Sequence, residues 1–126
     1  MKAALALLLV ASPAFASGWI VTKKPDPMTD ATRCMVTSPD GKLAFYRNGD
    51  DPPHVVTGSA YSSAGVYVRV DDREAIYIDR DPADTARLMD QLKTGQRLRF
   101  RYRDYPHTVE GEAPVGDLLS LLDDCQ

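Results

Sequence analysis

Two cysteines, one near each end, constrain the fold of this 126-residue chain more than any other feature. Cys34 and Cys125 are its only cysteines, so an oxidising compartment leaves them a single intramolecular pairing. Closing a loop of about 90 residues restricts the unfolded chain by roughly 4–5 kcal/mol in the entropic account of disulfides. The pair lacks the Cys-x-x-Cys spacing of reactive thiols. We therefore predict a structural Cys34–Cys125 disulfide.

The beginning of the chain has the pattern of a secretory leader. Lys2 precedes an apolar run over residues 3–11, and residues 14–16 match the small-x-small pattern of a signal-peptidase site. The run is about half of the ~20 residues that a membrane-spanning helix needs, which disfavours a retained anchor. We predict a cleaved signal peptide over residues 1–16, a single domain over residues 17–126 that spans no membrane, and a periplasmic or secreted location.

The charge balance argues against one class of partner. The chain carries 15 basic and 18 acidic side chains, and removal of the leader takes away one basic residue, Lys2. Nonspecific nucleic-acid binding depends on a positive surface field, which a net acidic chain lacks. We expect no nucleic-acid partner.

The N-terminal half has the alternation and the turn residues of antiparallel strands. Trp19 is the only tryptophan, and its ring is expected to close one end of the core. Pro39, Asp40 and Gly41 favour a tight reversal, so the strands on either side of them are expected to form a hairpin. We predict strands over residues 18–24, 31–38 and 43–47, with loops over residues 25–30, 48–54 and 58–65.

The clearest hairpin spans residues 66–80, where apolar and polar side chains alternate around a turn at residues 71–73. One face is therefore expected to lie in the core and the other in solvent. The core face holds Val66, Val68, Val70, Ile76 and Ile78, and the solvent face holds Tyr67, Arg69, Tyr77 and Asp79.

A helix is expected next, because the apolar period changes from two residues to about 3.6. Asp81 is a suitable N-cap, and Pro82 suits the first helical position. Gly95 is expected to end the helix in a left-handed conformation. The apolar stripe consists of Thr85, Leu88, Met89 and Leu92.

The end of the chain is expected to hold one more strand, over the arginine-rich run, and a last helix. Residues 106–114 would connect the two, with Pro114 in the first turn of the helix. The fold class that we predict is α+β: a mostly antiparallel, sandwich-like β-sheet with a crossover helix, a short C-terminal helix and one disulfide. A small β-sandwich with helical additions is the alternative. The stripe of the last helix is Val115, Leu118, Leu119 and Leu122.

Four arginines alternate with apolar residues in the run RLRFRYR, at Arg97, Arg99, Arg101 and Arg103. On a strand they point the same way at a spacing of about 6.6–6.8 Å, and their charges repel unless anions intervene. The favoured interpretation is a solvated face balanced by acidic residues of the preceding hairpin. The alternative is a docking surface for an acidic protein or a phosphorylated envelope glycan, with Tyr67 and Tyr77 beside it. The acidic candidates are Asp71, Asp72, Glu74 and Asp79.

Other chemistry-bearing residues form no recognisable motif. His54 and His107 lie in predicted loops without metal-ligand spacing, so we predict neither a metal site, a cofactor nor a catalytic residue. A hydrolase built on either histidine is the least favoured function. Asp26 and Asp30 have oxygens for a hard cation, but a side chain capping the local turn is the favoured role.

Several short motifs occur in an order that resembles a group of small exported bacterial proteins. They are DPMTD, YVRVDD, ARLMDQLKTGQRLRFRYR and VGDLLSLLDDC. This order is similar to that of proteins related to the invasion-associated locus B family, and of an accessory protein associated with type VI secretion. The resemblance implies an envelope-associated role without established catalytic residues. We therefore expect a non-enzymatic interaction module whose partner is another envelope protein or an anionic envelope component.

A second resemblance offers a different function. The run SAYSSAGVY, residues 59–67, is similar to the small-residue loop and tyrosine that periplasmic lysozyme inhibitors place in an active-site cleft. The alternative function is therefore a periplasmic enzyme inhibitor that acts through this loop.

Overall fold

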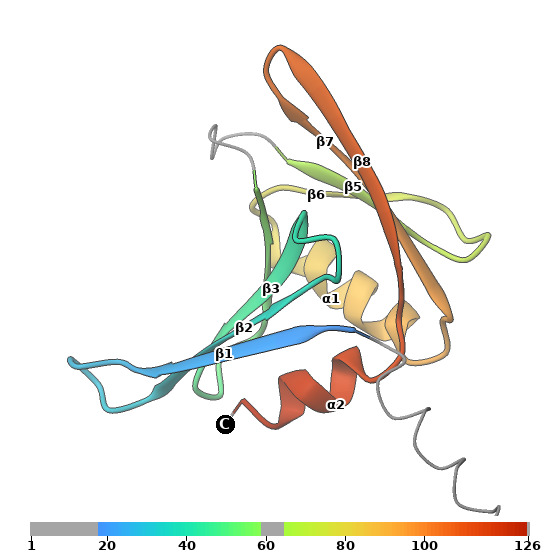
Figure 1. The fold of residues 1–126 in the computed structure, drawn as a ribbon. Coiled ribbons are helices and arrows are strands. Elements are labelled where there is room, and N and C mark those ends of the chain that lie inside the picture. Colours follow the sequence, from blue (N-terminus) through green and yellow to red (C-terminus); the bar gives the residue numbers. More distant parts are fainter. Residues whose placement is uncertain (1–17, 59–64, 126) are drawn as a thin grey trace, which may run out of the picture.

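The structure is a computed structural model, and it describes residues 18–58 and 65–125, which hold eight strands and two helices (Figure 1). The predicted leader over residues 1–16 lies outside the described residues. No helix in the described part of the chain is long and apolar enough to cross a membrane. The elements are β1 (Ile20–Pro25), β2 (Thr32–Thr37), β3 (Leu43–Asn48), β4 (His54–Thr57), β5 (Val66–Val70), β6 (Ile76–Ile78), α1 (Pro82–Leu92), β7 (Arg97–Asp104), β8 (His107–Pro114) and α2 (Leu118–Asp123).

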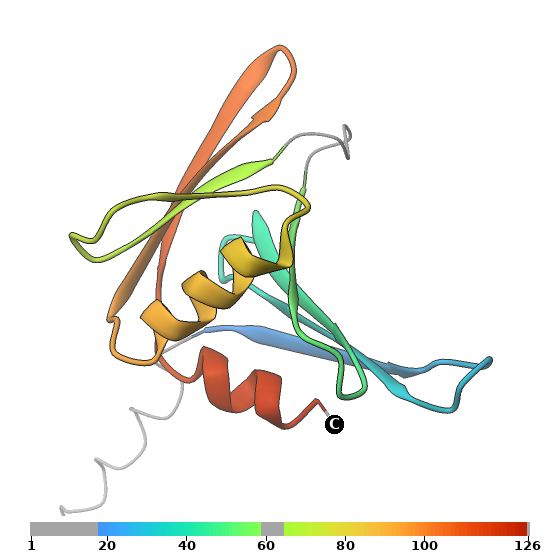
Figure 2. The same ribbon diagram turned by 180° about the vertical axis from the view of Figure 1, so that it is seen from behind.

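The strands form two antiparallel sheets, which confirms the predicted α+β class. The first sheet has the order β1-β2-β3-β4 and the second the order β6-β5-β7-β8. Helix α1 joins β6 to β7 on the two sides of β5, so it is the expected crossover helix. It packs against β5 and β6, whereas α2 packs against β2 (Figures 1 and 2).

One hydrophobic core joins both sheets and both helices. It forms because apolar side chains alternate along the strands: β7 is buried at every second residue, and β5 and β6 follow the same pattern. Trp19 is buried in the core, with its ring edge-on to Phe45 at 6.1 Å between centroids. Its Nε1 donates a hydrogen bond to the carbonyl of Pro114 at 2.8 Å, which ties the start of the first sheet to the end of the second.

Tyr102 makes a second connection between the sheets. This β7 residue is buried, and its hydroxyl donates to the carbonyl of Lys42 at 2.8 Å and accepts from the backbone N–H of Gly58 at 3.3 Å. Burial raises the pKa of Tyr102 above its ordinary value, because the charged phenolate would lose its hydration.

Helix α1 begins as the sequence predicts and ends differently. The Asp81 side chain accepts from the backbone N–H of Ala83 at 2.9 Å, and Pro82 occupies the first turn. Gly95 is not among the described glycines with positive φ, so the predicted left-handed cap is wrong. The glycine is needed for space instead, because a Cβ at this position would overlap Cγ1 of Val70.

Two strands depart from the sequence expectation. β4 lies between the two loops predicted over residues 48–54 and 58–65, where no strand was predicted, and β8 replaces the predicted connection over residues 106–114. All eight residues of β8 pair with β7. Gly111 fits this strand because it lies opposite Phe100, whose Cζ would be 2.5 Å from an added Cβ. Pro114 ends β8 rather than starting a helix, and α2 begins only at Leu118.

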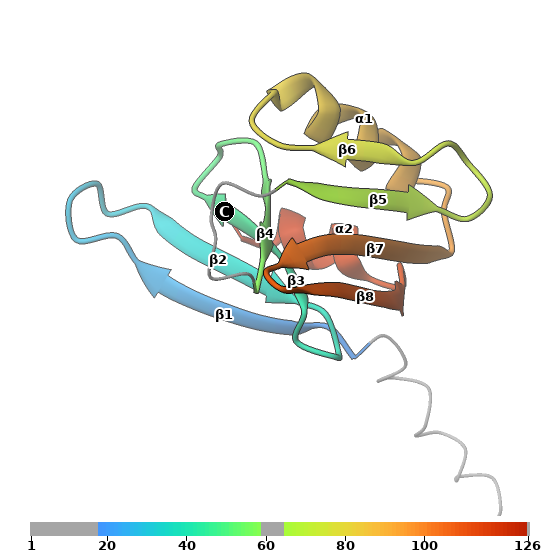
Figure 3. The ribbon, with the colours of Figure 1, turned by 90° about the horizontal axis from the view of Figure 1, so that it is seen from above.

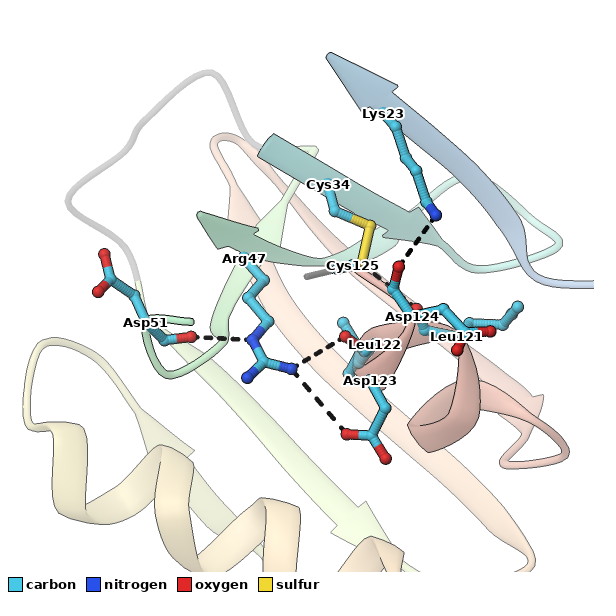
Figure 4. Close-up of a disulfide and its surroundings, with 9 residues drawn as sticks. All are labelled: Lys23, Cys34, Arg47, Asp51, Leu121, Leu122, Asp123, Asp124 and Cys125. Atoms are coloured by element: carbon cyan, nitrogen blue, oxygen red, sulfur yellow. Dashed lines mark hydrogen bonds and ion pairs between the residues drawn. A yellow bond between two sulfur atoms is a disulfide. The ribbon is translucent and has the colours of Figure 1, made fainter. Parts of the chain in front are cut away.

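The Cys34–Cys125 disulfide is present, with 5.5 Å between the Cα atoms, and joins β2 to the residue that follows the C-cap of α2 (Figure 4). Lys23 and Arg47 are the register neighbours of Cys34 on β1 and β3. Lys23 Nζ donates to the carbonyl of Asp124, and Arg47 Nη1 donates to that of Leu122, both at 3.0 Å. Two cations therefore bind the carbonyl end of α2 on either side of the disulfide, where positive charge is favourable.

Candidate binding surface

The outer face of the sheet β6-β5-β7-β8 carries the predicted arginine and tyrosine candidates. Strand alternation sends one set of side chains of this sheet to the core and the other set outward. Figure 3 looks onto the outward side, with α1 and α2 behind the four strands. Arg97, Arg99, Arg101, Arg103, Tyr67 and Tyr77 are all exposed.

A shallow hollow of about 500 Å³ lies in this face. Its charged and aromatic side chains come from three neighbouring strands, β5, β7 and β8, and the loop before β6 adds Ala75. Arg97, Arg103 and Tyr77 do not line the hollow. Arg103 and Tyr77 line a smaller depression together with Tyr67. The exposed charged and aromatic residues that line the hollow are Tyr67, Arg69, Arg99, Arg101, Glu110 and Glu112.

Two of the four arginines form ion pairs with β8. Arg97 Nη2 lies 2.5 Å from Glu112 Oε1, and Arg101 Nε lies 2.8 Å from Glu110 Oε2. The prediction that acidic residues of the preceding hairpin balance the stripe is wrong for these pairs. The Asp71 carboxylate accepts instead from the backbone N–H of Arg97 at 2.9 Å. Sequence reasoning missed Glu110 and Glu112 because it treated β8 as a connection.

Arg69 and Arg99 face each other across β5 and β7. Each makes one long hydrogen bond to a carbonyl of the turn after β5: Arg69 Nη2 donates to that of Asp72, and Arg99 Nη2 to that of Asp71, both at 3.3 Å. Among the described residues, no carboxylate lies within ion-pair distance of either guanidinium. The hollow therefore contains two directly opposed arginines that form no ion pair with a described carboxylate, although Glu112, which lines the same hollow, is the register partner of Arg99 on β8.

Tyr67 and Tyr77 form a ring pair next to these arginines. Their centroids are 4.7 Å apart and their planes are inclined by 50°. Tyr67 remains 53% exposed and Tyr77 44% exposed, so both rings are accessible to a partner. Tyr77 lies over Gly65, where an added Cβ would come within 2.5 Å of its ring. The glycine thus lets the ring lie close to the backbone, beside Tyr67.

The remaining candidates lie elsewhere in the fold. His54 and His107 are exposed, and both belong to strands rather than to the predicted loops. No group of three or more His, Cys, Asp or Glu side chains among residues 18–58 and 65–125 is placed to hold a metal ion. Most of the loop proposed for enzyme inhibition, residues 59–64, lies outside the described residues.

Asp26 has the predicted turn-capping role. Its Oδ1 accepts from the backbone N–H of Met28 at 2.9 Å and lies 3.3 Å from Arg33 Nη2. These contacts stabilise the ionised carboxylate, so the backbone hydrogen bond first, and then Arg33, lowers the pKa of Asp26 below its ordinary value. Asp30, which occupies the left-handed region at φ 60°, completes the turn.

Comparison of the chain with models of protein families, with curated proteins and with solved structures found no match.

Proposed function

We propose that this protein is an exported, non-enzymatic interaction module of the bacterial envelope. It binds an anionic partner through the outer face of β6-β5-β7-β8, and it works in the periplasm or after secretion. The observation that carries this proposal is the hollow in that face, where exposed Tyr67 lies beside Arg69 and Arg99, neither of which forms an ion pair with a described carboxylate.

The composition of this face favours protein binding over catalysis. Tyrosine and arginine are enriched in protein interfaces, because they combine a large contact area with hydrogen-bonding groups. A catalytic site would need a nucleophile or base held by a second polar group. The hollow offers instead guanidinium groups, one phenol and two carboxylates already paired with arginine.

The proposed location depends on the leader pattern and on the disulfide. A cross-link between distant parts of a small domain is typical of chains that fold in an oxidising compartment. Membership of the invasion-associated locus B family stays a prediction, as does the alternative of an enzyme inhibitor. An assay of lysozyme activity with micromolar protein tests that alternative, and full activity would exclude it.

Replacement of Arg99 and Arg101 by serine tests the proposed surface. We expect the double variant to lose a partner that the wild-type protein retains from envelope extract at low salt and releases at high salt, because the contact is electrostatic. Mass spectrometry identifies the partner, and titration of the purified partner measures the loss of affinity.

The matched control is the Lys24→Ser/Lys93→Ser variant, which removes the same charge from exposed positions on β1 and after α1. It should bind like the wild type. Two results would contradict the proposal and support a purely structural stripe. One is equal binding of the partner by the arginine variant and the wild type. The other is a free energy of unfolding of the arginine variant that is lower by several kcal/mol.

A further inference from the structure

We infer that the hollow binds an extended acidic peptide segment, with one carboxylate held between Arg69 and Arg99 and an apolar or aromatic side chain on Tyr67. This inference deepens the proposed function and depends on it, because it places the ligand on the same face of β6-β5-β7-β8.

The position of the carboxylate follows from which arginines are open. Arg97 and Arg101 are occupied by Glu112 and Glu110. Arg69 and Arg99 keep most of their five N–H donors, since each makes one bond to a backbone carbonyl. Directly opposed residues of an antiparallel pair have Cβ atoms about 4.5–5.5 Å apart, and like charges there are destabilising. A carboxylate between the two guanidiniums removes the repulsion and accepts charge-assisted hydrogen bonds from both.

The second anchor follows from the spacing along β5. Tyr67 and Arg69 are two residues apart on the same face, which separates them by about 6.6–6.8 Å. Side chains two residues apart on an extended peptide have the same spacing. A peptide with an acidic residue and, two positions away, an apolar one therefore contacts the arginine pair and the Tyr67–Tyr77 rings together.

The number of open cations favours a peptide over a polyanionic glycan. A glycan with repeated phosphates or carboxylates would match a row of open cations. On β7, however, Arg97 and Arg101, on either side of Arg99, are already ion-paired. One anionic position beside an aromatic pair fits a single acidic side chain with an apolar neighbour.

Titration with short synthetic peptides tests the inference. The purified, oxidised mature protein is observed by ¹⁵N NMR while a Glu-x-Phe peptide with Gly and Ser flanks is added. Matched peptides carry Gln-x-Phe or Glu-x-Ser. We expect the Glu-x-Phe peptide to shift the amide signals of β5 and β7 and the Nε–H signals of Arg69 and Arg99, and the other two peptides to bind at least about tenfold more weakly.

Protein variants assign the two anchors separately. Arg69→Gln or Arg99→Gln should weaken Glu-x-Phe binding about tenfold or more, whereas Arg103→Gln, on the same face but outside the hollow, should change it less than about twofold. Tyr67→Ser should weaken Glu-x-Phe binding and leave the weaker Glu-x-Ser binding unchanged.

Three results would overturn the inference. They are the absence of shifts at millimolar Glu-x-Phe, equal binding of the Gln-x-Phe peptide, and binding of a phosphorylated glycan in which Arg103→Gln has as large an effect as Arg99→Gln. If binding of the envelope partner still depends on Arg99 and Arg101 in these cases, the proposed function stands and only the peptide assignment fails. If neither the peptide nor an envelope partner binds, the peptide assignment and the proposed function are both rejected.

Discussion

At the scale of single residues, two aromatic side chains in the described part of the chain join the sheets by hydrogen bonds to the backbone of the other sheet or of the residues that flank its strands. Trp19 reaches Pro114, and Tyr102 reaches Lys42 and Gly58. Both are large aromatic residues whose polar atom finds a backbone partner while the ring fills the core, which is the usual way such residues are buried. The burial of Trp19 could be predicted because it is the only tryptophan, whereas the partners of Tyr102 depend on a packing of the sheets that no local pattern encodes.

Replacement of Tyr102 by phenylalanine should destabilise the protein without changing its shape. The substitution removes the hydroxyl and leaves the carbonyl of Lys42 and the N–H of Gly58 without this partner. We expect the free energy of unfolding at pH 7 to fall by about 1–3 kcal/mol, measured by urea titration. The control is Tyr105→Phe, because Tyr105 is 68% exposed, and it should be near neutral.

The same pair of proteins gives a pH dependence with a defined sign. The pKa of Tyr102 is raised in the folded protein, so its contribution to stability is complete below its ordinary pKa of 10.0 and is lost as the pH rises through the folded value. The stability difference between wild type and Tyr102→Phe should therefore be constant from pH 7 to 9 and shrink above about pH 10. A difference that grows at high pH would contradict the buried, neutral phenol.

At the scale of elements, sequence patterns predicted the strongly periodic segments and missed the short or atypical ones. The hairpin of β5 and β6 and the start of α1 were predictable, because alternation and capping residues mark them locally. β8 was not predictable, because its glycine, proline and two glutamates are residues typical of a loop. Its strand character depends on pairing with Phe100 and the arginines of β7, which the local sequence does not show. The exposed arginine face was therefore predictable, but which of its arginines form ion pairs with β8 was not.

Substitution of Gly95 tests the close contact between the segment after α1 and Val70 of β5. Gly95→Ala should lower the free energy of unfolding by about 1–3 kcal/mol, because the new methyl group overlaps Cγ1 of Val70. Val70→Ala in the same chain should remove the overlap, so the double variant should be more stable than the sum of the two single effects predicts. Strictly additive effects in urea titration would show that Gly95 does not limit this contact.

At the scale of the whole molecule, the disulfide encloses most of the fold. Every element from β3 to α2 lies within the loop closed by Cys34 and Cys125, as does the part of β2 that follows Cys34. The pairing was predictable from two cysteines and a leader pattern. The cations of Lys23 and Arg47 on either side of it were not, because they depend on the register of three strands.

The Cys34→Ser/Cys125→Ser variant should fold but lose much of its stability. We expect the free energy of unfolding to fall by about 2–5 kcal/mol, because the unfolded chain regains the freedom that the cross-link removes. Lys23 and Arg47 should still hold the end of α2. Mass spectrometry of the non-reduced wild type should find no free thiol, and two free thiols would refute the cross-link.

The position of this cross-link also decides how the molecule responds to mechanical tension. A pulling force applied between the region before β1 and the region after Cys125 passes through the two sulfur atoms and bypasses the loop. Of the described helices and strands, β1 and the first residues of β2 lie outside it, and β1 is an edge strand whose neighbour in the sheet is β2. A stretched molecule would thus peel away one strand and then stop extending, with the tyrosine and arginine face still folded.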